Sequence, residues 1–405
     1  MTEADADTLA ERVLAGDLAL YELADHADAD TAAAARRRVV ERRTGADLST
    51  TGEYAFDAAV ADANIENMIG AVQIPVGVAG PLPVAGEAAD GAFHLPLATT
   101  EGALVAGVNR GCGALRAAGE VTTRVIQTAM TRAPVFRTGG VAEAAAVAEW
   151  IEDNEARLAD AVESTTDYGE LLAVEPYVVG DAVYARFAVD SKDAMGMNMV
   201  TIAAEAASEV VTDATSAELV ALSGNLCADK KPAAINAVEG RGRTVAADAT
   251  VPRETVEERF GTTPAAVAEA NTRKNLVGSA KAGSLGFNAH VANVVAAAFL
   301  ATGQDAAQVV EGSNAITTAE VRDGDLYVSV TLSSLEVGTY GGGTDLPTQS
   351  EGLSVLGVDG GGDPPGTNAD ALAEVIAAGA LAGEVNLLGA LAANHLADAH
   401  ADLGR

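Results

Sequence analysis

The stretch Glu66–Val84, ENMIGAVQIPVGVAGPLPV, marks the point where the character of the chain changes. Before it, residues 1–61 carry many alanines at helical spacing, with basic residues at Arg36–Arg38 and Arg42–Arg43. Within it, Gly and Pro interrupt short apolar runs, which is typical of strands and tight loops. The sequence therefore predicts a helical N-terminal section over residues 1–64, followed by a unit that contains a sheet.

The rest of the chain predicts an α+β fold in which a small unit is inserted into a larger one. Residues 134–222 contain a helix candidate at Val141–Leu158 and strand candidates at Leu171–Val179 and Ala182–Val189. The larger unit comprises the two flanking segments, residues 65–133 and 223–405. A chain of 405 residues is long enough for such a division, with a substantial core.

Two segments of the larger unit have helical patterns. Small apolar residues over 280–308 predict a buried helix, and residues 370–398 have helical spacing as well. The apolar runs Val291–Leu300 and Val375–Gly383 are shorter than the roughly 20 residues that a membrane span requires. The N-terminal residues are acidic, unlike a signal peptide, and the chain has two cysteines. We therefore expect a cytoplasmic protein that binds no membrane.

The chain is strongly acidic, with 58 Asp and Glu against 25 Lys and Arg and a formal net charge of −33. Such a surface repels nucleic acid and anionic lipid, so neither is an expected partner. The acidic residues are spread along the chain, which favours adaptation to a salt-rich cytoplasm where counterions screen the self-repulsion. An ordinary acidic protein remains the alternative.

Two adjacent lysines, Lys230 and Lys231, stand out in a chain that contains only five lysines. Asp229 precedes them and Pro232 follows, which disfavours a helix and predicts a fixed loop. A lysine in a partly buried loop keeps its proton and can stabilise a developing oxyanion. Placement on the surface remains the alternative.

Two carboxylates lie in apolar surroundings. Glu101 follows two threonines and precedes an apolar helical run, so it is either a residue near a helix start or simply a cap. Asp305 lies within an apolar helical pattern, where a buried carboxylate must pair with a cation or shift its pKa. Lysine is the expected partner of Asp305, and a satisfied structural Asp remains the alternative.

Two glycine-bearing stretches, Asp193–Met199 and Gly338–Gly352, allow a backbone to approach a phosphate or a flat ring closely. Neither has the GxGxxG pattern between a strand and a helix, so a Rossmann site is not supported. Near the C-terminus, His395 and His400 are candidate acids because imidazole titrates near neutral pH.

Six motifs, in this order along the chain, resemble those of the 3-hydroxy-3-methylglutaryl-coenzyme A (HMG-CoA) reductase family, over about Ile65 to the C-terminus. They are ENMIGAVQIPVGVAGPL, ATTEGALVAG, DAMGMNM, SGNLCADKKPAAIN, GQDAAQ and GTYGGGT. The resemblance implies a large mixed helical and sheet domain for the acyl-CoA and an inserted ferredoxin-like small domain for the nucleotide. It also implies reduction of (S)-HMG-CoA to mevalonate and free CoA with two NADPH, no metal, and a homodimer or homotetramer with active sites at the subunit interface.

The resemblance also assigns roles to residues. It implies that the catalytic residues are Glu101, Lys230, Asp305 and His400, with His395 as the alternative to the last. It implies that substrate contacts fall on Arg132, Ser223, Asp229, Lys231, Lys274 and Asn293, with CoA contacts on Asn109 and Arg110. It implies that the nucleotide site contains Asp193, Met195, Gly196, Met197, Asn198, Gly341, Gly342 and Gly343.

One departure concerns the nucleotide. Where the eukaryotic family members place a Ser-Arg pair near the 2′-phosphate, this chain has Thr166 and Asp167, so Arg186 or Lys192 is the expected cation. Because of this departure, the alternative function is that of the degradative, NAD-linked branch of the family, which oxidises mevalonate.

Two more hypotheses come from the residues themselves. An acyl transferase would use Cys112 or Cys227 as a nucleophile, although neither cysteine has an obvious neighbouring base. A non-catalytic acidic assembly protein would leave the lysine pair unexplained.

Adaptation to salt predicts that the free energy of unfolding rises with KCl concentration, because counterions screen the self-repulsion of 58 acidic residues. Denaturant unfolding in a KCl series measures this, with a neutral osmolyte at matched osmolality as the control. Full stability at low salt would contradict the prediction.

Overall fold

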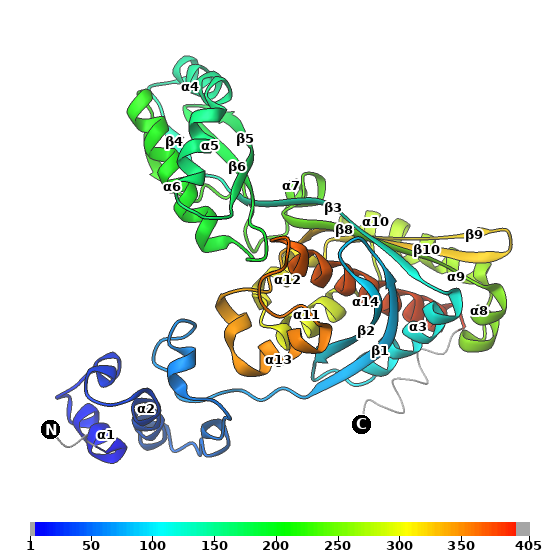
Figure 1. Ribbon diagram of the computed structural model, residues 1–405, viewed down its shortest axis with the longest axis horizontal. Helices are drawn as coiled ribbons and strands as arrows, with labels where there is room; N and C mark the ends of the chain where they lie inside the picture. The colour runs from blue at the N-terminus through cyan, green and yellow to red at the C-terminus, as the bar shows by residue number, and fades with distance from the viewer. Residues whose placement is uncertain (1–4, 394–405) are drawn as a thin grey trace.

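The computed structural model describes residues 5–393, which form an N-terminal helical section, a large unit and a small unit (Figure 1). The small unit projects from one end of the large unit, and the strand β3 runs from one into the other. The predicted α+β class is confirmed. The predicted boundaries at residues 64, 134 and 222 stay a prediction, which separate hydrophobic clusters in the three parts support.

The N-terminal section contains α1 (Ala6–Ala15) and α2 (Ala29–Thr44), as its alanine-rich pattern predicts. The side chains of Asp5 and Asp28 accept hydrogen bonds from the first turn of each helix, which satisfies N–H groups that lack a helical partner. The apolar faces of the two helices pack on each other in a small cluster of their own. The section also contains the 3₁₀ turns Leu20–Asp25, Thr50–Gly52 and Ala58–Ala61.

The sheet of the large unit has the strand order β2-β1-β3-β8-β10-β9. Its strands are β1 (Val76–Ala85), β2 (Asp90–Ala98), β3 (Val121–Arg132), β8 (Gly242–Val251), β9 (Ala315–Arg322) and β10 (Asp325–Leu335). Neighbouring strands are antiparallel except β1 and β3. The Gly- and Pro-rich stretch that opens the unit therefore forms a strand only over its second half.

The long helix α14 (Thr367–Ala392) runs beneath this sheet and is buried along most of its length (Figure 1). It packs against α3 (Leu104–Ala118), α11 (Val291–Thr302) and β8. Small residues allow this close approach, since a Cβ at Gly111 would clash with the Ala382 carbonyl oxygen. Within residues 5–393, α14 alone is long and apolar enough to cross a membrane, but 78% of its apolar window is buried inside the fold.

Two buried carboxylates on α14 accept hydrogen bonds from loops. Glu374 accepts from the backbone N–H of residues 87, 88 and 89, at 2.8–3.2 Å. Glu384 accepts from the N–H groups of Ala289 and His290 at 2.7 and 2.8 Å, and from the Thr317 hydroxyl at 2.7 Å. An ionised carboxylate can be buried only with such donors, so both residues join loops to the central helix.

The small unit has an antiparallel sheet in the order β7-β4-β6-β5, with helices between β4 and β5 and between β6 and β7. Its elements are β4 (Val135–Arg137), α4 (Val141–Asp153), α5 (Glu155–Glu163), β5 (Glu170–Val179), β6 (Ala182–Asp190), α6 (Met197–Ala214) and β7 (Glu218–Ala221). This β-α-β-β-α-β order is that of a ferredoxin-like unit. The two predicted strands are therefore present, as β5 and β6.

Two predicted helices have different bounds. The helix predicted over Val141–Leu158 is broken at Asn154, which ends α4 and precedes α5. The prediction of one helix over 280–308 is wrong, because only Val291–Thr302 is helical in its middle. Gly283 ends the preceding helix in a left-handed conformation, and Gly303 ends α11 in the same way.

Short elements complete the large unit. They are α7 (Ala234–Val238), α8 (Arg253–Phe260), α9 (Pro264–Ala270), the π-helix Asn271–Gly278, α10 (Ser279–Ala282), the 3₁₀ turn Ala306–Gln308, α12 (Val309–Gly312), the 3₁₀ turn Gly342–Asp345 and α13 (Pro347–Leu356).

Replacing Glu384 by Ala should lower the free energy of unfolding by about 3 kcal/mol, because two backbone N–H groups and a hydroxyl lose their buried acceptor. Denaturant unfolding at fixed KCl measures the change. Glu351→Ala, at an exposed position of α13, is the control and should change stability by less than about 0.5 kcal/mol. Equal unfolding midpoints for the two variants would contradict the role of Glu384.

Candidate functional site

The two predicted reactive residues Lys230 and Asp305 form an ion pair, with 2.7 Å between Lys230 Nζ and Asp305 Oδ2. Both are partly exposed, at 42% and 29% of the side chain. The hydrogen bond to Asp305 is the main reason that the pKa of Lys230 lies above its usual value, and burial opposes it. Lys230 therefore keeps its proton at neutral pH and loses it only as the pH rises through that raised pKa.

Lys230 lies in the loop that leads from β7 back to the large unit, as the sequence predicts. The loop is sharply bent, with positive φ at Asn225, Ala228 and Lys230 (63°, 48° and 56°). The Asn236 amide donates to the Ala228 carbonyl at 3.1 Å and holds the bend. The backbone N–H of Lys230 donates to the Glu311 carboxylate.

Asp305 does not lie in a helix, so that part of the prediction is wrong. Helix α11 ends at Gly303, and Asp305 begins the next 3₁₀ turn, where its Oδ1 accepts from the Ala307 N–H at 3.0 Å. Its other oxygen is left for Lys230. A Cβ at Gly303 would clash with the Gly343 carbonyl, so only glycine lets the Asp305 turn approach the Gly341–Gly343 loop.

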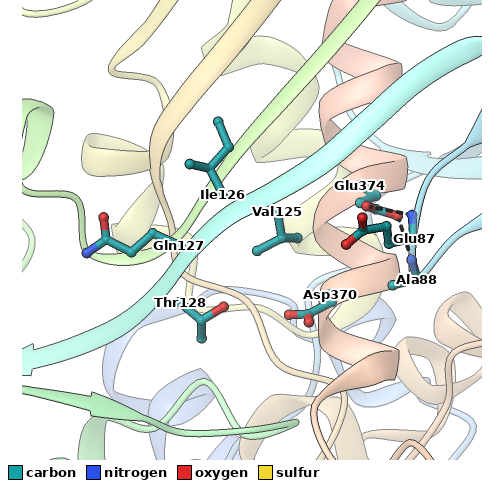
Figure 2. Close-up of a pocket in the computed structure, with 8 residues that line it drawn as sticks. All are labelled: Glu87, Ala88, Val125, Ile126, Gln127, Thr128, Asp370 and Glu374. Atoms are coloured by element: carbon teal, nitrogen blue, oxygen red, sulfur yellow. Dashed lines mark hydrogen bonds between the residues drawn. The ribbon is translucent and has the colours of Figure 1, made fainter. Parts of the chain in front are cut away.

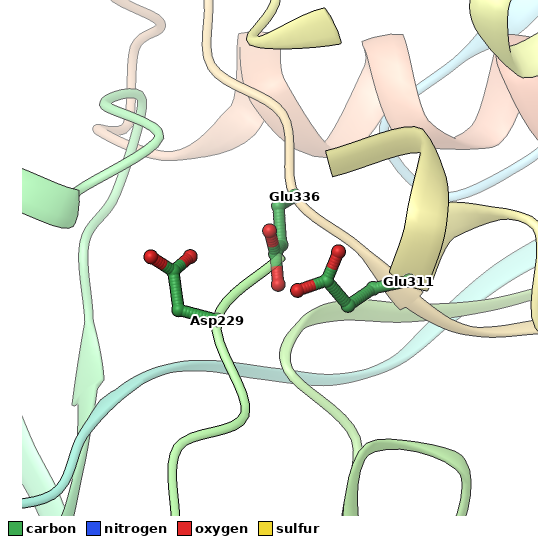
Figure 3. Close-up of side chains that lie close together, drawn as sticks. All are labelled: Asp229, Glu311 and Glu336. Atoms are coloured by element: carbon green, nitrogen blue, oxygen red, sulfur yellow. The ribbon is translucent and has the colours of Figure 1, made fainter. Parts of the chain in front are cut away.

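Behind Lys230 lies a buried carboxylate cluster formed by Asp229, Glu311 and Glu336 (Figure 3). The fully buried Arg241 contacts all three carboxylates: Nη2 lies 3.1 Å from Asp229, and Nη1 bonds Glu336 and lies 3.7 Å from Glu311. Burial raises the pKa of Glu311 and raises that of Glu336 well above its usual value. Arg241, Glu311 and Glu336 were not predicted from the sequence, because no local pattern shows that residues far apart in the chain converge.

Glu101 lies apart from the ion pair in the described part of the chain. Its Oε1 accepts a hydrogen bond from the Asn293 amide at 3.2 Å, and its side chain is exposed. Its turn lies at the surface of the single chain just before α3, so the apolar residues that neighbour Glu101 in the sequence do not bury its side chain. The position near a helix start agrees with the prediction.

The predicted substrate contacts are spread around the lysine loop and beyond it. The Arg132 guanidinium donates twice to the Thr201 hydroxyl, at 2.7 and 3.0 Å, and Lys231 Nζ donates to the Asp229 carbonyl at 2.9 Å. The Ser223 hydroxyl lies 4.0 Å from the Cys227 sulfur. Lys274 is exposed on the π-helix.

The two predicted CoA contacts lie next to each other on α3. Asn109 accepts from the Gly80 N–H at 3.1 Å, and Arg110 donates to the Asn386 side chain on α14 at 3.1 Å. Both side chains are exposed, as residues that receive a ligand must be.

The predicted nucleotide residues lie where the small unit meets the large one. Asp193 is buried and accepts from two backbone N–H groups at the start of α14 and from that of Gly362 in the preceding loop, at 2.7–3.1 Å, so its carboxylate is already occupied. Its carbonyl accepts from the Thr339 N–H at 2.8 Å, and a Cβ at Gly338 would clash with the Met195 N–H. The two glycine-bearing stretches are therefore side by side.

The remaining predicted nucleotide residues differ in exposure. Gly196 is buried and precedes α6 with a φ of 95°, and the Met197 sulfur lies 2.7 Å from Arg241 Nη2, whereas Asn198 is exposed. A Cβ at Gly341 or Gly342 would meet no atom within 4 Å, so their backbone faces open space.

The cations expected near the 2′-phosphate are both engaged. Arg186 is buried and donates to the Gly240 carbonyl at 2.9 Å. Lys192 Nζ lies 2.5 Å from Asp190 and 3.8 Å from Glu170.

Neither cysteine suits covalent catalysis. Burial raises the pKa of Cys112 to about 12, which keeps its thiol protonated at neutral pH. Cys227 is fully buried in the loop that carries the lysines. The predicted histidines His395 and His400 lie outside the described residues.

A hollow of about 240 Å³ lies between β3 and α14, away from the ion pair (Figure 2). Its lining residues are Glu87, Ala88, Val125, Ile126, Gln127, Thr128, Asp370 and Glu374. Glu374 is already bonded to the loop backbone, and the other charged lining residues are acidic. An anionic ligand such as a nucleotide would be repelled there.

A family model described as hydroxymethylglutaryl-coenzyme A reductase matches residues 32–405. The chain is 70% identical over 402 residues to the 3-hydroxy-3-methylglutaryl-coenzyme A reductase of Halobacterium salinarum, with 99% of each chain covered. It is 68% identical over 401 residues to the protein of that name from Haloferax volcanii, covering 99% of this chain and 100% of the other.

The fold is similar to that of a class II 3-hydroxy-3-methylglutaryl-CoA reductase from Streptococcus pneumoniae, solved with bound NADPH. The TM-score is 0.68 at 19% identity, over 88% of this chain and 86% of that one. At this identity the likeness concerns the fold alone.

Replacing Asp305 by Asn should lower the pKa of Lys230 toward that of an ordinary lysine, because the hydrogen-bonded charge that favours the ammonium is lost. With only five lysines in the chain, NMR of isotopically labelled lysine side chains can follow the titration. The signal of Lys281, in α10, serves as the reference. An unchanged Lys230 titration would contradict the pairing.

Proposed function

The chain belongs to the hydroxymethylglutaryl-coenzyme A reductase family, and on that premise we propose that it reduces (S)-HMG-CoA to mevalonate and free CoA with two NADPH. The Lys230–Asp305 ion pair, within two of the family motifs, carries the proposal. The two relatives named above are 70% and 68% identical to this chain over at least 99% of their length. We therefore propose the reaction for which they are named.

Lys230 has the charge and the position that the first reduction requires. Reduction at the thioester carbon turns its carbonyl oxygen into an alkoxide, and an ammonium about 3 Å away stabilises this oxygen by several kcal/mol in a water-poor site. Asp305 keeps that ammonium protonated and oriented. Collapse of the alkoxide breaks the carbon–sulfur bond and releases CoA as a thiolate.

Two protons then have to be delivered by acids. The thiolate, with a pKa of about 8.5, takes a proton from an imidazolium, which we assign to His400 with His395 as the alternative. After the second reduction the aldehyde oxygen takes a proton, which we assign to Glu101. The sum is HMG-CoA, two NADPH and two protons giving mevalonate, CoA and two NADP⁺.

The nucleotide is proposed to bind against the two adjoining glycine-bearing stretches, where it supplies the hydrides. The open backbone at Gly341 and Gly342 and the exposed Asn198 at the start of α6 fit a phosphate-bearing ligand. In this proposal Asp193 holds its loop in place and does not contact the nucleotide, because the backbone N–H groups of Gly362, Gly366 and Ala369 already occupy its carboxylate.

We propose a homodimer or homotetramer in the cytoplasm, with a second copy covering Glu101. The segment that leads into β1 exposes the apolar residues Ile65 and Val72, at 49% and 85%, and the first residue of β1, Val76, is 64% exposed. Thr99, two residues before Glu101, donates to the Pro75 carbonyl at 3.0 Å, so this segment and Glu101 share one surface. A partner on that surface would remove Glu101 from water.

One observation supports the NAD-linked alternative, in which the protein oxidises mevalonate. Lys192 and Arg186, the expected partners of a 2′-phosphate, are already bonded within the chain. A nucleotide without that phosphate needs no such cation.

With HMG-CoA in a KCl series, the protein should oxidise NADPH faster than NADH, and Lys230→Ala should lower turnover by at least about a hundredfold through loss of the oxyanion partner. Nicotinamide absorbance and release of the CoA thiol measure the reaction. Lys281→Ala, at an exposed position of α10, is the matched control and should keep its rate. Faster oxidation of NADH than of NADPH, or turnover of mevalonate with NAD⁺ and CoA, would instead support the NAD-linked alternative.

A further inference from the structure

Arg241, Glu311 and Glu336 have no part in the chemistry above, yet they are fully buried next to the reactive lysine. Burying three charged side chains is costly, so their arrangement requires a reason. The guanidinium of Arg241 already supplies the positive charge that the carboxylate cluster needs. A metal ion is therefore not inferred there.

The segment from Asp305 to Glu311, which comprises the 3₁₀ turn and most of α12, contacts the lysine loop at three points. Asp305 pairs with Lys230 Nζ, the Gln308 amide donates to Asp229 Oδ1 at 3.3 Å, and Glu311 accepts the backbone N–H of Lys230. These contacts hold both the backbone and the side chain of Lys230 against one short segment.

The backbone of Lys230 needs such support. Its φ of 56° lies in the left-handed region, which is unfavourable for a residue with a Cβ. Strained conformations persist at functional sites where the surroundings hold them. The contact from Glu311 is made to the N–H of this same residue, and Arg241 in turn holds Glu311 and Asp229.

We propose that Glu311 and Arg241 are positioning residues, which hold the backbone of Lys230 in the left-handed conformation that directs its ammonium to Asp305. The role of Lys230 in this inference rests on the proposed function. Arg241 also contacts the Met197 sulfur at the start of α6, so the same residue touches the predicted nucleotide loop.

The test compares Glu311→Leu, which removes the acceptor of the Lys230 N–H, with Glu311→Gln, which keeps an oxygen there. Glu311→Leu should lower kcat by about tenfold to a hundredfold with little change in KM, since a small misplacement of a catalytic group has that effect. It should also lower the pKa of Lys230, measured by lysine NMR. Glu311→Gln should restore most of both.

The charged groups that face Lys230 are Asp305, Asp229 and Glu336, and all remain in both variants. Glu384→Ala, which lowers stability elsewhere, is the control for a purely structural effect and should leave the Lys230 titration unchanged. A folded Glu311→Leu variant with an unchanged Lys230 titration would overturn the inference.

A third measurement uses the unsubstituted protein and does not depend on the folding of any variant. The Lys230 amide should be protected from hydrogen exchange, because Glu311 accepts its N–H. Rapid exchange of this amide would overturn the inference. Both NMR readouts need no substrate, so failure of the proposed reaction alone would leave them interpretable.

Discussion

The 2.7 Å contact between the Lys230 ammonium and the Asp305 carboxylate joins two loops that are 75 residues apart in the sequence. Both groups are partly open to water, where the attraction between unit charges is weak, so the pair depends on backbones that are already in place. The bend of the lysine loop and the end of α11 at Gly303 provide these backbones. The buried carboxylate cluster and Arg241 lie directly behind them.

The central helix α14 connects this site to the rest of the molecule. Asp193 of the small unit binds the N–H groups at its start, and Arg243 bonds Asp370 in its first turn and the Lys192 carbonyl, both at 2.6 Å. Glu384, further along, holds the loop that precedes α11. The small unit and the loop that precedes α11 are thus both bonded to α14, and α11, whose end leads to Asp305, packs against the same helix.

Much of the fold and part of the site could be predicted from local patterns. The strand candidates Leu171–Val179 and Ala182–Val189 are present as β5 and β6, and Pro232 indicated that Lys230 lies in a loop. The order of six motifs indicated the family, which the comparisons confirm. These features depend on neighbours within a few residues, so the sequence alone determines them.

Other features depend on residues that are distant in the chain. The spacing of apolar residues around Asp305 is typical of a helix. In the structure α11 instead ends at Gly303, whose backbone lies against the Gly343 carbonyl. Glu101 has an apolar context in sequence, yet its turn lies at the surface of the single chain. No local sequence pattern predicts that Arg241 contacts the carboxylates of Asp229, Glu311 and Glu336. Burial and charge pairing are set by whatever the folded chain places around a side chain, and so only the tertiary structure decided them.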